Sequence, residues 1–163
     1  MKRVSTVALI AIILWGSAVL APVIQAKGAD GQALDDEGVQ TMLSGLGYEP
    51  KKLTKGFLIT VKKDTWTYYV QFVLSSDKSR LGMNANLGSV PNPDDVTAAQ
   101  WRGLLIQNNE IDPSSFNFDK DQKKVYIHRV LENRALTPAY VRQQIENFTA
   151  NIKDSAEFWK FVK

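Results

Sequence analysis

The segment from Lys124 to Phe148 constrains the fold most, because it joins a strand pattern to the start of an amphipathic helix. Its first part is rich in β-branched and aromatic residues, which favour an extended strand. Thr137 then precedes Pro138, the pattern of a helix N-cap followed by proline at the first helical position. Apolar residues recur with helical spacing at Val141, Ile145, Phe148 and Ile152. We therefore expect a strand that delivers a long helix onto a sheet.

The upstream chain supplies the strands that such a sheet needs. Alternating or β-rich stretches are expected to form strands at Phe57–Val61, Trp66–Leu74 and Arg80–Leu87. In the second stretch one face carries mainly large apolar residues, namely Trp66, Tyr68, Val70, Phe72 and Leu74. The other face is mixed, with Thr67, Tyr69, Gln71 and Val73. This alternation predicts a sheet with one covered face and one more polar face.

Two further helices and one more strand complete the expected order. An acidic start at Asp35 and the apolar residues Val39, Met42, Leu43 and Leu46 predict a first helix. Val96 to Asn109 predicts a second helix, with Trp101, Leu104 and Leu105 as its apolar contacts. A short strand around Phe116 and Phe118 precedes the strand at Lys124, and the last helix is expected to run, unbroken or with a break near Asp154, to Trp159 and Phe161. The chain is therefore predicted to be α+β, with a five-stranded antiparallel sheet, helices packed on one face and the order α-β-β-β-α-β-β-α.

The first residues have the layout of a secretory signal peptide. Lys2 and Arg3 precede an uncharged apolar run from Val7 to Leu20, and Ala26 closes a cleavage site. We expect residues 1–26 to be a signal peptide, residues 27–34 a flexible lead-in and residues 35–163 the folded domain. The protein is then exported to the periplasm or the extracellular space. The alternative is an uncleaved membrane anchor, because Val4 to Ala26 nearly suffices to span a bilayer.

The composition excludes several function classes. The sequence contains no cysteine, which excludes a disulfide scaffold, thiol catalysis and cysteine-ligated metals. Removal of Lys2 and Arg3 lowers the formal net charge from +3 to +1, because residues 1–26 contain no acidic residue. A near-neutral domain gives no case for nucleic-acid binding.

No group of residues predicts catalysis or a cofactor. His128 is the only histidine, and without a second ligand or a nucleophile it indicates a structural or surface role. Asp119, Asp121 and Lys123 resemble the start of a calcium loop, but Lys124 stands where that loop needs glycine. The expectation is a charged hairpin turn, no metal, no cofactor and no enzymatic activity.

Two polar segments have alternative interpretations. The stretch from Lys51 to Lys63 is rich in lysine, which is typical of a protected sheet edge but also suits an anionic lipid surface or another polyanion. Contact with a membrane is expected only through this hairpin or the signal segment. Glu132, Asn133 and Arg134 are expected to bond the backbone around the turn and the helix start, with a ligand role as the alternative.

Four stretches resemble a known superfamily: LGYEP at 46–50, WTYYVQFVLS at 66–75, MNANLG at 83–88 and HRVLENRALTP at 128–138. Together with the element order, they resemble the type III secretion chaperone-like fold, which includes Tir-chaperone and YbjN-type proteins, over residues 35–159. The resemblance implies a non-catalytic protein-binding domain, often dimeric, whose sheet and second helix meet partners. Secretion chaperones of this fold work in the cytosol and tend to be acidic, whereas this chain is near neutral and is expected to be exported.

The function expected from the sequence is therefore protein binding or self-association in the bacterial cell envelope. The alternative, from another class, is a small-ligand or anionic-surface binding protein that uses the basic hairpin. Side chains on a strand alternate, so the residues opposite the core should form the association surface. The predicted surface consists of Thr67, Tyr69, Gln71, Asn84 and Asn86 together with Trp101 on the second helix.

Overall fold

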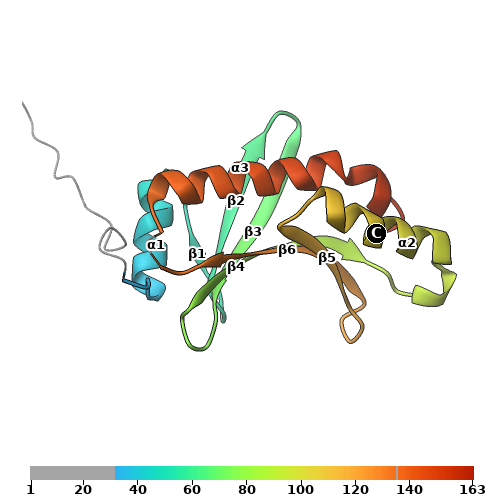
Figure 1. The fold of residues 1–163 in the computed structure, drawn as a ribbon, viewed down its shortest axis with the longest axis horizontal. Helices are drawn as coiled ribbons and strands as arrows, with labels where there is room; N and C mark the ends of the chain where they lie inside the picture. Colours follow the sequence, from blue (N-terminus) through green and yellow to red (C-terminus); the bar gives the residue numbers. More distant parts are fainter. Residues whose placement is uncertain (1–31, 135) are drawn as a thin grey trace, which may run out of the picture.

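The computed structural model describes residues 32–134 and 136–163. The predicted signal peptide, its cleavage site and most of the lead-in lie outside these residues. The helices and strands, in chain order, are α1 (Asp36–Gly45), β1 (Lys51–Lys52), β2 (Phe57–Lys63), β3 (Trp66–Leu74), β4 (Arg80–Ser89), the 3₁₀ turn η2 (Pro93–Asp95), α2 (Ala98–Glu110), β5 (Ser114–Asp119), β6 (Lys124–Glu132), α3 (Pro138–Asp154) and the 3₁₀ turn η3 (Ala156–Trp159). Figure 1 shows α3 lying across the strands, with α1 near one end of it and α2 near the other.

The α+β class and the antiparallel sheet are confirmed, but the predicted five strands were wrong. The sheet has six strands in the order β1-β2-β3-β4-β6-β5, and all neighbours are antiparallel. The extra strand is β1, which pairs Lys51 with Leu58 and Lys52 with Phe57. Two exposed lysines show neither alternation nor β-propensity, so this strand forms only because β2 offers it a partner edge.

The helix starts use the local signals that the sequence carries. The side chain of Thr137 accepts a hydrogen bond from the backbone N–H of Tyr140 at 3.2 Å, with Pro138 at the first helical position. Thr97 and Gln100 form a reciprocal capping box at the start of α2. Helix α3 ends at Asp154 and is followed by η3, so the alternative with a break is the correct one.

One apolar core fills the space between the helices and the inner face of the sheet. The apolar stripe predicted for the last helix, namely Val141, Ile145, Phe148 and Ile152, is buried throughout. It packs in one cluster with strand residues that point the same way, among them Ile59, Val70, Phe72, Met83 and Ile127, and with Val39, Met42 and Leu43 of α1. The helices therefore cover one face of the sheet, as the alternation predicted.

Asn133 joins the segment just before α1 to the β3–β4 turn. Its side-chain oxygen accepts from the backbone N–H of Leu34 at 3.1 Å, and its amide nitrogen donates to the carbonyl oxygens of Leu34 and Lys78, each at 2.8 Å. Leu34, which the sequence analysis assigned to the lead-in of residues 27–34, is buried. Asn133 does bond backbone groups, as expected, but those of the α1 entry and the β3–β4 turn instead of its own turn.

The two central strands separate along much of their length. The pairing of β3 with β4 covers Gln71–Leu74 and Leu81–Asn84 only, whereas β3 pairs with β2, and β4 with β6, over nearly their whole lengths. Beyond the separation, Ser89 and Lys163 exchange two backbone hydrogen bonds of 2.7 and 2.9 Å. The backbone N–H and C=O of Ser89 both point to Lys163, so Ser89 and Lys124 of β6 face each other as a pair without hydrogen bonds between them. Lys163 therefore lies on the side of β4 that faces β3.

Candidate functional site

The open face is the side of the sheet opposite the helices, and no described element covers it. Alternate side chains of β2, β3, β4, β6 and β5 point to this side and are exposed or half-buried. Tyr69 is 60% exposed, and Val130 is also exposed. Thr67, Tyr69, Gln71, Asn84 and Asn86, which were predicted to lie opposite the core, all lie here.

A polar row crosses the open face from β3 to β5. Gln71 pairs with Asn84, Asn84 with His128, and His128 with Ser115. The Nδ1 of His128 lies 2.7 Å from Oδ1 of Asn84, so the imidazole is held by an amide and not by a carboxylate. Burial lowers the pKa of His128, because partial removal from water disfavours the charged ring. Within the row, the hydrogen bond that the structure gives the imidazole is the one to the Asn84 amide.

Tyr69, Thr67 and Asn86 lie together at a second place on this face. Tyr69 pairs with Thr60 of β2 on one side. On its other side it has no partner in β4, because the pairing of β3 with β4 ends at Gln71. All three line a cavity of about 180 Å³ that opens at this separation. An exposed aromatic ring beside an amide and a hydroxyl gives this part of the face both apolar area and directional hydrogen-bonding groups.

Trp101 lies apart from the other five predicted residues. Its ring packs against Phe118 at a centroid distance of 5.1 Å and against Phe161 at 5.5 Å. Phe118 is on the same face of β5 as the buried Phe116, so Trp101 lies on the helix-covered side of the sheet. The six residues therefore do not form one continuous surface, because the second helix packs against β5 and η3 on the helix-covered side, while the other five lie on the open face of β3 and β4.

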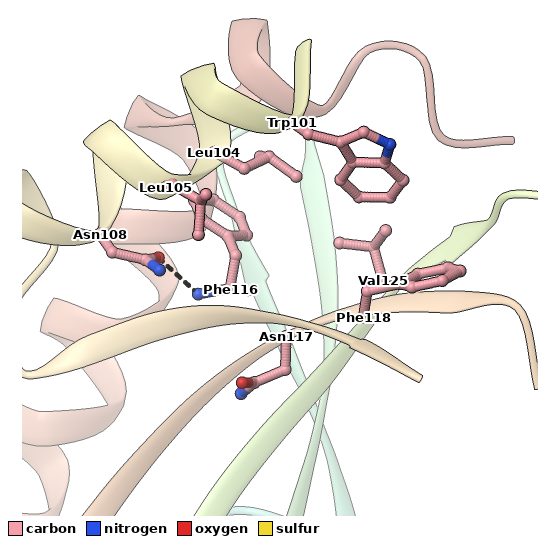
Figure 2. Close-up of a pocket in the computed structure, with 8 residues that line it drawn as sticks. All are labelled: Trp101, Leu104, Leu105, Asn108, Phe116, Asn117, Phe118 and Val125. Carbon is pink, nitrogen blue, oxygen red and sulfur yellow. Dashed lines mark hydrogen bonds between the residues drawn. The ribbon is translucent and has the colours of Figure 1, made fainter. Parts of the chain in front are cut away.

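The α2–β5 groove is a separate apolar feature, with a volume of about 140 Å³. Figure 2 shows Trp101, Leu104 and Leu105 pointing from α2 toward Phe116 and Phe118 of β5, while Asn117 points away. Asn108 accepts a hydrogen bond from the backbone N–H of Phe116 at 2.7 Å and so ties the helix to this edge strand.

The exposure of Leu105 and Ile106 on α2 was not predicted. Leu105 is 68% exposed, although the sequence assigned it to the helix's apolar contacts with Leu104. Consecutive residues on a helix point about 100° apart, so Leu104 and Leu105 cannot both be buried beneath it, and Leu105 lies at the rim of the groove. That spacing was the signal available in the sequence for the exposure of Leu105.

The basic hairpin is partly neutralised within the fold. Lys52 Nζ lies 2.7 Å from the carboxylate of Asp36 and 4.4 Å from the centroid of the Phe57 ring. Because Lys51 and Lys52 form the edge strand, the arrangement fits the interpretation of lysines as edge protection. It leaves fewer free cations for an anionic surface than the sequence suggested.

The charged turn at Asp119 is structural in its contacts. Its carboxylate accepts from the backbone N–H groups of Asp121 and Gln122, each at 2.9 Å. Among residues 32–134 and 136–163, no group of three or more His, Asp or Glu side chains is placed to hold a metal ion. Over the same residues no helix is both long and apolar enough to cross a bilayer.

Comparisons with known proteins identify the fold. No family model matches the chain, and no curated protein matches it. The structure is similar to YbjN from E. coli, with a TM-score of 0.56 and 11% identity, covering 77% of this chain and 90% of that one. It is also similar to a chain of the HopA1–SchA chaperone–effector complex, with a TM-score of 0.51 and 11% identity over 72% of this chain and 89% of that one.

A third similar structure is a chain of the ExsC–ExsE complex, with a TM-score of 0.50 and 22% identity. The match covers 77% of this chain and 92% of that one. The fold expected from the sequence resemblance is thus confirmed over nearly the whole length of three solved chains. At these identities the likeness concerns the fold.

Proposed function

We propose that the chain is a non-catalytic protein-binding domain of the bacterial cell envelope, which uses the open face to bind another protein chain. The observation that carries this proposal is the exposure of Tyr69 in the middle of a sheet face without a helix over it. A second copy of the chain is the first partner to test. Export follows from the basic start and the apolar run of the first residues, and it is part of the proposal.

The chemistry of the open face suits a protein contact. Tyrosine supplies a large contact area with few rotatable bonds, and residues of this type carry much of the binding energy at interfaces. Thr67, Gln71 and Asn86 surround it with groups that donate and accept hydrogen bonds. The fold comparison adds support, because one similar chain comes from a chaperone–effector complex, in which two proteins bind each other.

The surroundings of His128 bear on whether the open face is catalytic. Its imidazole is bonded to the amide of Asn84, and its cross-strand neighbour Ser115 makes no hydrogen bond to it. The amide and hydroxyl side chains of the open face offer hydrogen bonds and do not titrate near neutral pH. This supports a binding role over an enzymatic one.

The replacement Tyr69→Ala tests the proposal, with Tyr140→Ala as the matched control. Tyr140 is 44% exposed on α3, so both variants remove an exposed tyrosine, but only one alters the open face. Light scattering should show a dimer for the unaltered protein and for Tyr140→Ala, and a monomer for Tyr69→Ala. For a different partner, cross-linking in the envelope fraction should give an adduct that Tyr69→Ala alone loses.

The proposal fails if Tyr69→Ala keeps both the oligomeric state and every cross-linked adduct of the unaltered protein. Circular dichroism of both variants provides the folding check. If association of the folded protein instead depends on Leu105 of α2, tested as Leu105→Ser, the binding surface is the α2–β5 groove and the open face is not used.

A further inference from the structure

Strand β3 has a free inner edge over its first half. Its pairing with β4 begins only at Gln71, and of the described strands β2 alone pairs with the residues before that point. The backbone N–H of Ser75 donates to the carbonyl oxygen of Arg80 at 2.9 Å, so the backbone groups of Ser75 point to β4. Backbone groups along a strand point alternately to one neighbour and to the other. Those of Tyr69 and Thr67 therefore point away from β2, into the space between β3 and β4.

The facing edge of β4 is closed by the chain itself. The backbone N–H of Gly88 donates to the side-chain oxygen of Asn86 at 3.0 Å, and Ser89 exchanges two backbone hydrogen bonds with Lys163. The register of β4 also shifts between Asn86 and Gly88, and a bulge of this kind blunts a sheet edge. Of the two edges that separate here, β4 has this protection.

The edge of β3 has no such protection among the described residues. The inward-pointing backbone N–H and C=O groups of Thr67 and Tyr69 form no hydrogen bond with any residue of 32–134 or 136–163. A row of unpaired backbone groups on a strand is a template for a further strand. Addition of an extended peptide to such an edge is a common mode of peptide recognition. The group that fits this edge is therefore the backbone of an extended segment.

The space beside this edge determines which side chains such a segment can carry. It measures about 180 Å³, and none of the residues that line it is charged. Ile152 and Trp159 bound it on the helix-covered side, while Thr67, Tyr69 and Asn86 bound it on the open face. Side chains along a strand point alternately to the two sides. A segment that lies along β3 therefore presents apolar side chains to the helices and neutral polar ones to the open face.

We propose that the inner edge of β3 binds an extended segment of a partner protein, antiparallel to β3, whose neutral side chains alternate between apolar and polar. All neighbouring strands of this sheet are antiparallel, and the added strand follows the same arrangement. The inference rests on the proposed function, because it states how the open face holds the other chain. Tyr69 then contributes twice, with its exposed ring and with its backbone N–H and C=O.

Titration of the ¹⁵N-labelled protein with an acetylated, amidated peptide of alternating threonine and valine tests the proposal. The backbone amide resonances of Thr67 and Tyr69 should shift, saturate and exchange more slowly with solvent. In the antiparallel pair the peptide's threonines lie opposite these residues, and their N–H groups bond to β3. N-methylation of the threonines should weaken binding about tenfold or more. N-methylation of the valines, whose N–H groups point away from β3, should keep most of the affinity.

A matched pair of protein variants tests the same bonds from the other side. Thr67→Pro removes the N–H that points away from β2, so it deletes no hydrogen bond of the β2–β3 ladder. Thr67→Val keeps this N–H and removes only the hydroxyl. Peptide binding should be lost in Thr67→Pro and kept in Thr67→Val, with circular dichroism as the folding check. The two methylated peptides need no change in the protein, so they decide the question if Thr67→Pro does not fold.

Three results would overturn the proposal. Equal affinities of the two methylated peptides would mean that backbone pairing with β3 is not used. If no peptide shifts the Thr67 and Tyr69 amides while association still depends on the Tyr69 ring, the strand pairing is wrong and the protein-binding role stands. If these amides become protected as the protein concentration rises without peptide, a second copy occupies the edge. Association that is indifferent to Tyr69→Ala contradicts the proposed function itself.

Discussion

The two faces of the sheet are built on the same strands but have different tasks. On β3, Phe72 is fully buried beneath the helices, while Tyr69 points the other way and is mostly exposed. On β6 two adjacent residues show the same difference, because Arg129 points to the covered side and His128 to the open side. The covered face supplies the buried apolar contacts of the core. The open face carries side chains that are not needed for that core and are available for binding.

The polar residues of the two faces are also held differently. Arg129 is almost fully buried, and its guanidinium donates only to neutral oxygens, at 2.9 Å to Ser114 and 2.8 Å to Gln144. Burial lowers the pKa of Arg129, because removal from water disfavours the charged guanidinium. On the open side, His128 keeps some contact with water and one amide partner. Arg129 forms no salt bridge with another described residue, and desolvation outweighs the field of Asp112 in its pKa, so this buried charge is a cost on the covered face. The open face tolerates polar groups.

The largest difference between the faces should appear in Phe148→Ala and Tyr69→Ala. Phe148 is fully buried against the sheet, so its truncation should lower the free energy of unfolding by about 3–5 kcal/mol. Tyr69→Ala should change it by no more than about 0.5 kcal/mol, the range of ordinary surface changes. Urea melts measure both. Equal losses would mean that the open face contributes to stability as much as the covered face does, and the proposed difference between the two faces would be wrong.

The next effect concerns Arg129→Met, which removes the buried charge and keeps most of the side-chain volume. We expect the free energy of unfolding to stay unchanged or to rise by about 1–2 kcal/mol, since desolvation of a buried charge that lacks a salt bridge is costly. The exposed Arg102 on α2 provides the control, as Arg102→Met. A loss above about 1 kcal/mol in urea melts would show that the hydrogen bonds to Ser114 and Gln144 outweigh the burial.

The smallest effect is a dependence of stability on pH that originates on the open face. The folded-state pKa of His128 lies below its unfolded value, so the unfolded chain binds more protons as the pH falls below about 6.5. The free energy of unfolding should hold above that pH and decline as the pH falls through the lower, folded-state pKa. His128→Gln should remove this decline in urea melts at pH 7.5, 6.5 and 5.5. A decline that persists in the variant must come from other groups.

The sequence predicts what depends on local order along the chain. The alternation of Tyr68 and Tyr69 was enough to assign them to opposite faces, and Thr137 with Pro138 was enough to locate the start of α3. These properties follow from the twofold period of a strand and from bonds within one helical turn. The open-face part of the candidate site was predictable for the same reason.

The remaining features depend on partners distant in the sequence. Strand β1 exists only through β2, and Trp101 takes its place from Phe118 and Phe161. The separation of β3 from β4 has no local signal either, because Trp66 to Val70 continue the same alternation after their pairing with β4 has ended. The cavity at that separation is therefore a product of tertiary packing that periodicity does not reveal.

The contacts of Asn133 have a consequence for the time course of folding. Its side chain joins Leu34 and Lys78, which lie 99 and 55 residues away along the chain. Contacts that close such long loops give their stabilisation only after the entropy of closure has been lost, so we expect them to form after the main barrier. Asn133→Ala should then leave the refolding rate nearly unchanged and mainly accelerate unfolding in stopped-flow experiments. The hydrogen bonds of this amide would then form late in folding and slow the unfolding of the native state.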